Sequence, residues 1–91
     1  MTNIGRMSLG KALVDQLQQH VLDVMRGTPA CALGEHGLGN NELEELCGLS
    51  LHLESQDHYL TYSILQSLVA AGKIEQIRWP QAPTRPKYRL R

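Results

Sequence analysis

Residues 55–74 read SQDHYLTYSILQSLVAAGKI, and this stretch decides the fold. Its apolar residues recur at spacings of three and four, which predicts a helix with one apolar stripe that must pack against other elements. The stripe consists of Leu60, Ile64, Leu65 and Leu68. Gly72 is expected to end the helix, because glycine readily adopts the left-handed conformation of a helix C-cap. Ile74 begins a strand-like pattern directly afterwards, so the stretch predicts a helix that leads into a β-hairpin.

Length and composition limit the class of protein. The 91 residues offer apolar surface for one hydrophobic core. We expect a flexible N-terminal tail over residues 1–8 and a single domain over residues 9–91. No apolar run approaches the roughly 20 residues that cross a bilayer, and the N-terminus lacks the apolar segment of a signal peptide. The sequence therefore predicts a cytoplasmic protein with no membrane partner.

The sequence predicts neither a cofactor nor a catalytic site. Cys31 and Cys47 are the only cysteines, and no closely spaced pair of cysteines or histidines is typical of a zinc site. Both cysteines are expected to be free thiols. The spacings give no catalytic triad, and the glycine-containing run at residues 34–40 lacks a P-loop lysine. We therefore expect no enzymatic activity and no small-molecule substrate.

Charges are divided unevenly along the chain. Three basic and eight acidic residues precede Lys73, whereas six basic residues and one acid, Glu75, make up the charges from Lys73 onward. The first part has a net charge of −5 and the second a net charge of +5. This asymmetry indicates an anionic partner at the C-terminal end. An alternative interpretation is that these cations only protect a strand edge from aggregation.

A first helix is predicted over residues 9–26. Its apolar residues keep helical spacing, Ser8 is a suitable N-cap, and Gly27 and Pro29 are expected to end the helix. The stripe consists of Leu9, Leu13, Leu17, Val21, Val24 and Met25. We expect this stripe to belong to the core rather than to an interface.

The segment after this helix is predicted to be mainly loop. Residues 28–40 contain one proline and three glycines, and residues 30–33 offer one short strand. A second helix is expected over residues 42–47, with Asn40 and Asn41 as candidate capping residues and Glu44, three residues after Asn41, as the acid of a capping box. Leu43 and Leu46 are expected to face inward.

Two strands are predicted after Gly72, over residues 73–79 and 87–91. Tyr88 and Leu90 alternate with basic residues, so the second strand is expected to have one buried and one cationic face. The run between the strands contains three prolines and is expected to be the hairpin loop, with Arg85 at its tip. Trp79 is expected to cover the open end of the core.

The chain resembles the winged helix-turn-helix superfamily in ELEELCGLS (42–50), LTYSILQSLVAAGKI (60–74) and the hairpin strands KIEQIRW and KYRLR. The most specific piece is LQSLVAAGKIE, a leucine-spaced helix end followed by a glycine and a strand. The resemblance implies a mainly helical α+β fold of three helices and a C-terminal hairpin wing. It also implies a DNA-binding transcriptional regulator, with residues 55–72 as the recognition helix and residues 73–91 as a basic wing.

Two sets of residues are candidates for contact with double-stranded DNA. Wing cations suit phosphates, and polar residues on the helix front suit base edges or phosphates. The wing set is Arg78, Arg85, Lys87, Arg89 and Arg91, and the helix set is His58, Tyr59, Thr61, Tyr62, Ser63 and Gln66. About four phosphate contacts give a slope of log affinity against log salt near −3.6. This is weak for a monomer, so a homodimer or a protein partner is expected.

Other features favour a different function. The helix front has no Arg or Lys, and Glu54 and Asp57 would repel phosphates. The fold would then serve as a protein–protein interaction or dimerisation module without direct nucleic-acid binding. Structural roles also remain open for Tyr59, Tyr62 and Thr61. The two functions differ in whether the helix front and the basic hairpin form one continuous surface.

Overall fold

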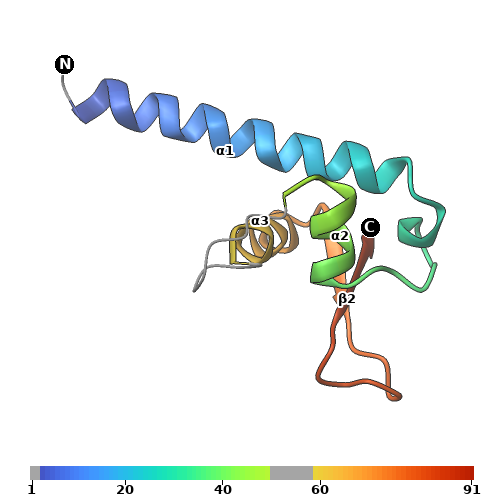
Figure 1. Cartoon of the computed structure of the whole chain (residues 1–91). Helices are drawn as coiled ribbons and strands as arrows, with labels where there is room; N and C mark the ends of the chain where they lie inside the picture. The colour runs from blue at the N-terminus through green and yellow to red at the C-terminus, as the bar shows by residue number, and fades with distance from the viewer. Residues whose placement is uncertain (1–2, 50–58) are drawn as a thin grey trace.

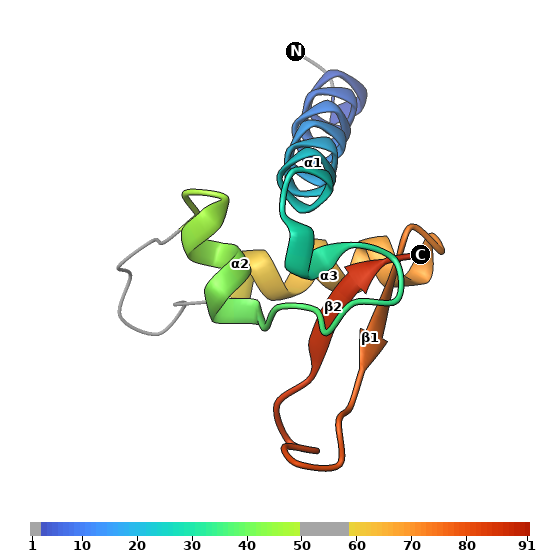
Figure 2. The ribbon, with the colours of Figure 1, turned by 90° about the vertical axis from the view of Figure 1, so that its right-hand side faces the viewer.

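The computed structural model describes residues 3–49 and 59–91, with side chains from residue 10 onward. Within these residues, three α-helices precede a two-stranded hairpin (Figure 1). The elements are α1 (Asn3–Arg26), a 3₁₀ turn η1 (Pro29–Cys31), α2 (Asn40–Leu46), α3 (Tyr59–Ala70), β1 (Ile74–Ile77) and β2 (Lys87–Leu90). The hairpin points away from α1 (Figure 2). The predicted fold of three helices and a C-terminal hairpin is confirmed.

One hydrophobic core joins the helices to the hairpin. Met25 of α1, Leu43 of α2, Leu65 of α3 and Tyr88 of β2 are each at most 1% exposed. The stripe predicted for α3 is confirmed, because Leu60 packs against this core and its other three members are buried in it. Gly72 has a φ of 74° and follows α3, as predicted for the helix end. The predicted start of this helix at position 55 lies outside the described residues.

A segment before α2 extends the hairpin by one backbone pairing. β1 and β2 pair antiparallel, with Gln76 opposite Tyr88. Leu38 lies on the other side of Tyr88, and the two residues exchange backbone hydrogen bonds of 3.0 and 2.8 Å. Gly37 permits this approach, because a Cβ at its position would lie 2.8 Å from the carbonyl oxygen of Tyr88.

The strand predicted over residues 30–33 is wrong. Pro29 instead begins the 3₁₀ turn η1, in which the N–H of Ala32 donates to the carbonyl of Pro29. Proline supplies a φ that suits the first position of such a turn. The additional pairing beside β2 therefore comes from Leu38, further along the chain.

α1 is longer than predicted and only half of it lies in the core. It begins at Asn3, so residues 3–8 are helical rather than a tail, and Ser8 lies within the helix instead of capping it. Val21 and Met25 are fully buried, but Leu13 is 52% exposed. The prediction that the whole stripe belongs to the core is therefore wrong, because the N-terminal half of α1 extends beyond the other elements (Figure 1).

α2 begins two residues earlier than predicted, and its N-cap is Gly39 rather than Asn40 or Asn41. The acid that closes the cap is Glu42, whose carboxylate accepts a hydrogen bond from the N–H of Gly39 at 3.1 Å. Leu43 is buried as predicted, whereas Leu46 is 52% exposed. Because α2 is short, only one of these two leucines reaches the core.

The cysteines of this domain are structural. Cys31 and Cys47 are free thiols buried in the core, and burial raises the pKa of each. Within residues 3–49 and 59–91, no three metal-ligating side chains lie together. No helix of the same residues has the length and hydropathy that crossing a membrane requires.

Candidate nucleic-acid interface

The solvent-facing side of α3 is uncharged. Tyr59 and Tyr62 are 67% and 50% exposed, and Ser63 beside them is half-buried. No residue of α3 is acidic or basic. This helix front can therefore offer hydroxyl groups and aromatic rings to a partner, but no ion pairs. His58, which was assigned to the same front, lies outside the described residues.

Thr61, assigned to the helix front from the sequence, is instead fully buried. It stands three residues before Ile64 and seven before Leu68, and therefore lies on the buried stripe. The sequence spacing already contained a signal that Thr61 is buried. Thr61, Ile64 and Leu68 match a helical repeat as well as Leu60, Ile64 and Leu68 do. Thr61 has no access to a nucleic acid in this arrangement.

Gln66 joins α3 to both strands of the hairpin. Its amide nitrogen donates to the side-chain oxygen of Gln76 at 3.1 Å and to the hydroxyl of Tyr88 at 3.0 Å. From the sequence, Gln66 is a candidate for contact with base edges or phosphates. In the structure its amide N–H groups are engaged within the protein, so Gln66 has a positioning role at the junction of helix and wing.

The pKa of Tyr88 shows which groups surround this junction. Burial raises the pKa of its phenol, the hydrogen bond from Gln66 opposes this, Tyr62 raises it further and Arg78 lowers it. Tyr62 of the helix front and Arg78 of the wing are thus electrostatic neighbours of the same hydroxyl. The front of α3 and the wing therefore meet at this hydroxyl, whereas Glu54 and Asp57, which decide whether the two form one continuous surface, lie outside the described residues.

Two of the predicted phosphate ligands are already paired with acids. Lys87 Nζ lies 2.9 Å from a carboxylate oxygen of Glu42, and this contact is the largest cause of a lowered Glu42 pKa. Arg89 Nε donates to the carboxylate of Glu75, its partner across the hairpin. Another nitrogen of Arg89 donates to the carbonyl of Glu35 at 2.7 Å. These cations hold the wing in place.

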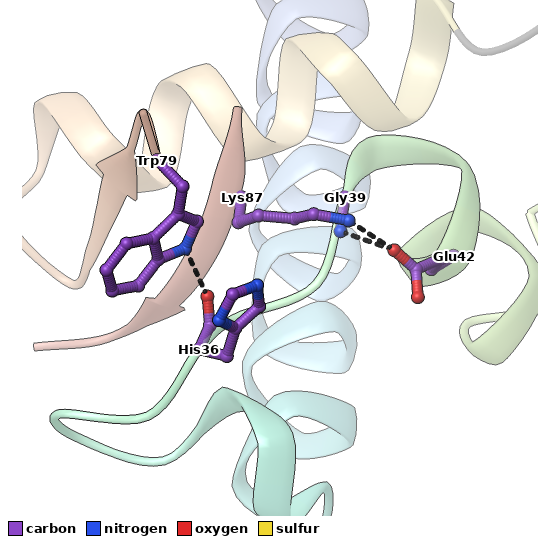
Figure 3. Close-up of polar contacts among 5 residues, drawn as sticks. All are labelled: His36, Gly39, Glu42, Trp79 and Lys87. Atoms are coloured by element: carbon purple, nitrogen blue, oxygen red, sulfur yellow. Dashed lines mark hydrogen bonds and ion pairs between the residues drawn. The ribbon is translucent and has the colours of Figure 1, made fainter. Parts of the chain in front are cut away.

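Trp79 fixes the wing to the loop before α2. Its ring stacks on His36 with centroids 4.8 Å apart and planes 4° from parallel, and its N–H donates to the carbonyl of His36 at 2.9 Å (Figure 3). The prediction that Trp79 covers the end of the core is wrong. Together with the Lys87–Glu42 pair in the same view, this contact joins the wing to residues 36–42 (Figure 3).

The cations that remain available lie at opposite ends of the hairpin. Arg85 is exposed in the loop between the strands, and Arg91 is exposed beyond the end of β2. Neither makes an ion pair with another described residue. Arg78 is also exposed, and it donates to the carbonyl of Pro83 at 2.8 Å, which braces the loop that presents Arg85. The loop end of the hairpin thus presents two arginines.

The chain has three helices and then one hairpin, which is hydrogen-bonded to the third helix. This arrangement defines the winged helix-turn-helix fold. No protein family and no curated protein matches the sequence.

Among solved structures, the chain is similar to the crystal structure of the PcaV transcriptional regulator from Streptomyces coelicolor in complex with its natural ligand. The TM-score is 0.60 and the identity is 21%, over 97% of this chain and 59% of the regulator. The chain thus spans less than two thirds of that protein, and this likeness concerns the fold.

Proposed function

We propose that this chain is a winged-helix regulator of transcription that binds double-stranded DNA, with α3 in the major groove and the wing on the backbone. The observation that carries the proposal is the hydrogen-bonded junction at Gln66, which links α3 to both strands. A recognition helix and a wing must keep a fixed relative position to contact one groove and its phosphates together. The likeness in fold to a transcriptional regulator gives further support.

Base readout is assigned to the exposed residues of α3. Tyr59, Tyr62 and Ser63 carry hydroxyls that both donate and accept hydrogen bonds, so they suit base edges or phosphate oxygens. Hydroxyls are less selective than a bidentate arginine or amide, so sequence preference is expected to be moderate. His58 remains a candidate for the same front.

Phosphate binding is assigned to Arg78 and Arg85 at the loop end of the wing. Lys87 and Arg89 act as positioning residues, because their charges are paired with Glu42 and Glu75. Arg91 lies at the other end of the hairpin, away from Arg85. Two phosphate contacts at about 0.9 each predict a slope of log affinity against log salt near −1.8 per chain.

Fluorescence anisotropy with a random-sequence duplex tests this proposal across a salt series. Arg85→Ala should reduce the magnitude of the slope by about 0.9, because one phosphate contact is lost. Arg26→Ala is the matched control, since it removes one exposed arginine at the end of α1 and makes the same change in net charge. The proposal fails if the wild type does not bind at low salt, or if both variants change the slope equally.

A second candidate function is protein association through the same surface. The front of α3 is uncharged and carries Tyr59 and Tyr62, both at least half exposed. These features favour protein association, because tyrosine is enriched at protein interfaces and charged residues are depleted there. This candidate gains if the wild type fails to bind DNA at low salt. Tyr59→Ala should then weaken capture of the partner while leaving the fold intact.

A further inference from the structure

The front of α3 carries two exposed aromatic side chains. Tyr59 and Tyr62 are 67% and 50% exposed and stand three residues apart, a spacing that makes side chains neighbours on a helix. With about 3.6 residues per turn, Tyr59, Tyr62 and Gln66 lie within roughly 60° of one another around the helix axis. Thr61 and Leu68, both buried, lie on the opposite side. The two tyrosines therefore form a row that continues from Gln66 towards the start of α3.

The other end of this row lies at the wing. Gln66 donates hydrogen bonds to Gln76 and Tyr88 of the hairpin. Side chains alternate along an extended chain, so Arg78, two residues after Gln76, is expected on the same face of the hairpin. The pKa of Tyr88 agrees with this position, because Tyr62 and Arg78 both act on its hydroxyl, in opposite directions. The row of tyrosines thus ends near an exposed cation.

Exposed aromatic rings near a cation suit an unpaired nucleotide better than a base pair. In a duplex, the faces of the bases are stacked on one another, and only their edges are open in the grooves. An unpaired base exposes its face, which stacks on aromatic side chains whatever the base. Sites for single strands combine such rings with cations that contact the backbone. α3 itself has no charged residue, so it offers a nucleotide rings and hydroxyls, and the cation comes from the wing.

We propose that the front of α3 also binds single-stranded DNA, with two unpaired bases stacked on Tyr59 and Tyr62 and the adjoining phosphate on Arg78. The inference rests on the proposed function, because it takes DNA as the ligand and adds the unpaired strand to the duplex. It assigns the rings of the two tyrosines to unpaired bases, whereas their hydroxyls serve the edges of paired ones. The chain then recognises DNA whose strands have separated, with little dependence on base sequence.

Fluorescence anisotropy of the full chain with a labelled oligothymidylate of about 12 nucleotides tests the inference, since this strand does not pair with itself. The wild type should bind it at low salt. Tyr62→Ala should raise the Kd for the single strand at least about fivefold, because one base loses its stacking partner, and Tyr59→Ala should behave likewise. Tyr62→Phe is the matched control. It keeps the ring and removes only the hydroxyl, so it should bind the single strand as the wild type does.

The salt dependence separates stacking from phosphate contact. Arg78→Ala should reduce the magnitude of the slope of log affinity against log salt by about 0.7, the value for one phosphate contact with a single strand. Tyr62→Ala should lower the affinity and leave the slope unchanged, because it removes no charge. Arg26→Ala, which removes an exposed arginine at the end of α1, should leave both unchanged. Equal slopes for Arg78→Ala and Arg26→Ala would contradict the contact with Arg78.

Three further results would overturn the inference. A wild type that binds the duplex but not the oligothymidylate overturns it and leaves the proposed function standing. A Tyr62→Ala variant that binds the single strand as the wild type does means that no base stacks on this ring. Equal losses in Tyr62→Ala and Tyr62→Phe assign the contact to the hydroxyl. A wild type that binds neither DNA overturns the inference and the proposed function together. Circular dichroism of each variant verifies that the domain is folded.

Discussion

A buried hydroxyl without a partner costs stability, and Thr61 carries one. Among residues 3–49 and 59–91, its buried Oγ1 has no hydrogen-bond partner, and its neighbours on the stripe of α3 are apolar. We expect Thr61→Val to raise the free energy of unfolding by about 1 kcal/mol, because the methyl group removes a desolvated polar atom and keeps the shape. A urea titration measures the change.

Thr28→Val is the matched control for this prediction. The hydroxyl of Thr28 donates to the carbonyl of Val24 at 2.7 Å and closes the end of α1. The same substitution should therefore lower the free energy of unfolding by about 1 kcal/mol. If Thr61→Val destabilises the protein as much as Thr28→Val does, the hydroxyl of Thr61 has a partner and the prediction is wrong.

One element that joins the hairpin to the rest of the domain is the segment at Leu38. Gly37 and Gly34 both have positive φ, of 85° and 81°, but only a Cβ at Gly37 would collide with the backbone of Tyr88. Gly34→Ala should cost about 1 kcal/mol for its backbone conformation alone. Gly37→Ala should cost roughly 3 kcal/mol or more, because the Leu38–Tyr88 pairing must also shift. Equal losses in thermal unfolding of the two variants would contradict this.

The contact between the wing and α2 depends on pH. Lys87, and then the N–H of Gly39, lower the pKa of Glu42 from its ordinary value of 4.5. A carboxylate whose pKa is lowered by folding stabilises the fold above its ordinary value and loses this contribution as the pH falls through the lowered pKa. We expect the contact at neutral pH and its loss below pH 4.5. Because both groups are partly exposed, it contributes less than about 1 kcal/mol.

Trp79 reports this change, since it stacks on the loop that precedes Glu42. Its fluorescence should show an acid transition that is reduced in Glu42→Gln, which cannot form the ion pair at any pH. Both proteins keep the stacking of Trp79 on His36, so they differ only in the carboxylate of Glu42. An identical acid transition in the two proteins would mean that Glu42 does not hold the wing.

Periodicity predicted the elements better than their contacts. It identified α3, its buried stripe and both strands, because these follow from local spacing and from Gly72. It did not reveal that Leu13 is exposed, since an apolar stripe indicates that a partner surface is required without saying whether the same chain supplies it. The contacts of Gln66 with Tyr88 and of Trp79 with His36 join residues far apart in the sequence, so local spacing carries no signal for them.

At the scale of the whole molecule, the basic C-terminal part of the sequence does not give an equally basic surface. Two of the six C-terminal cations are neutralised by acids, one of which, Glu42, comes from the acidic part of the sequence. The exposed cations at the loop end of the wing are therefore few, and one copy has a small electrostatic contribution to DNA binding.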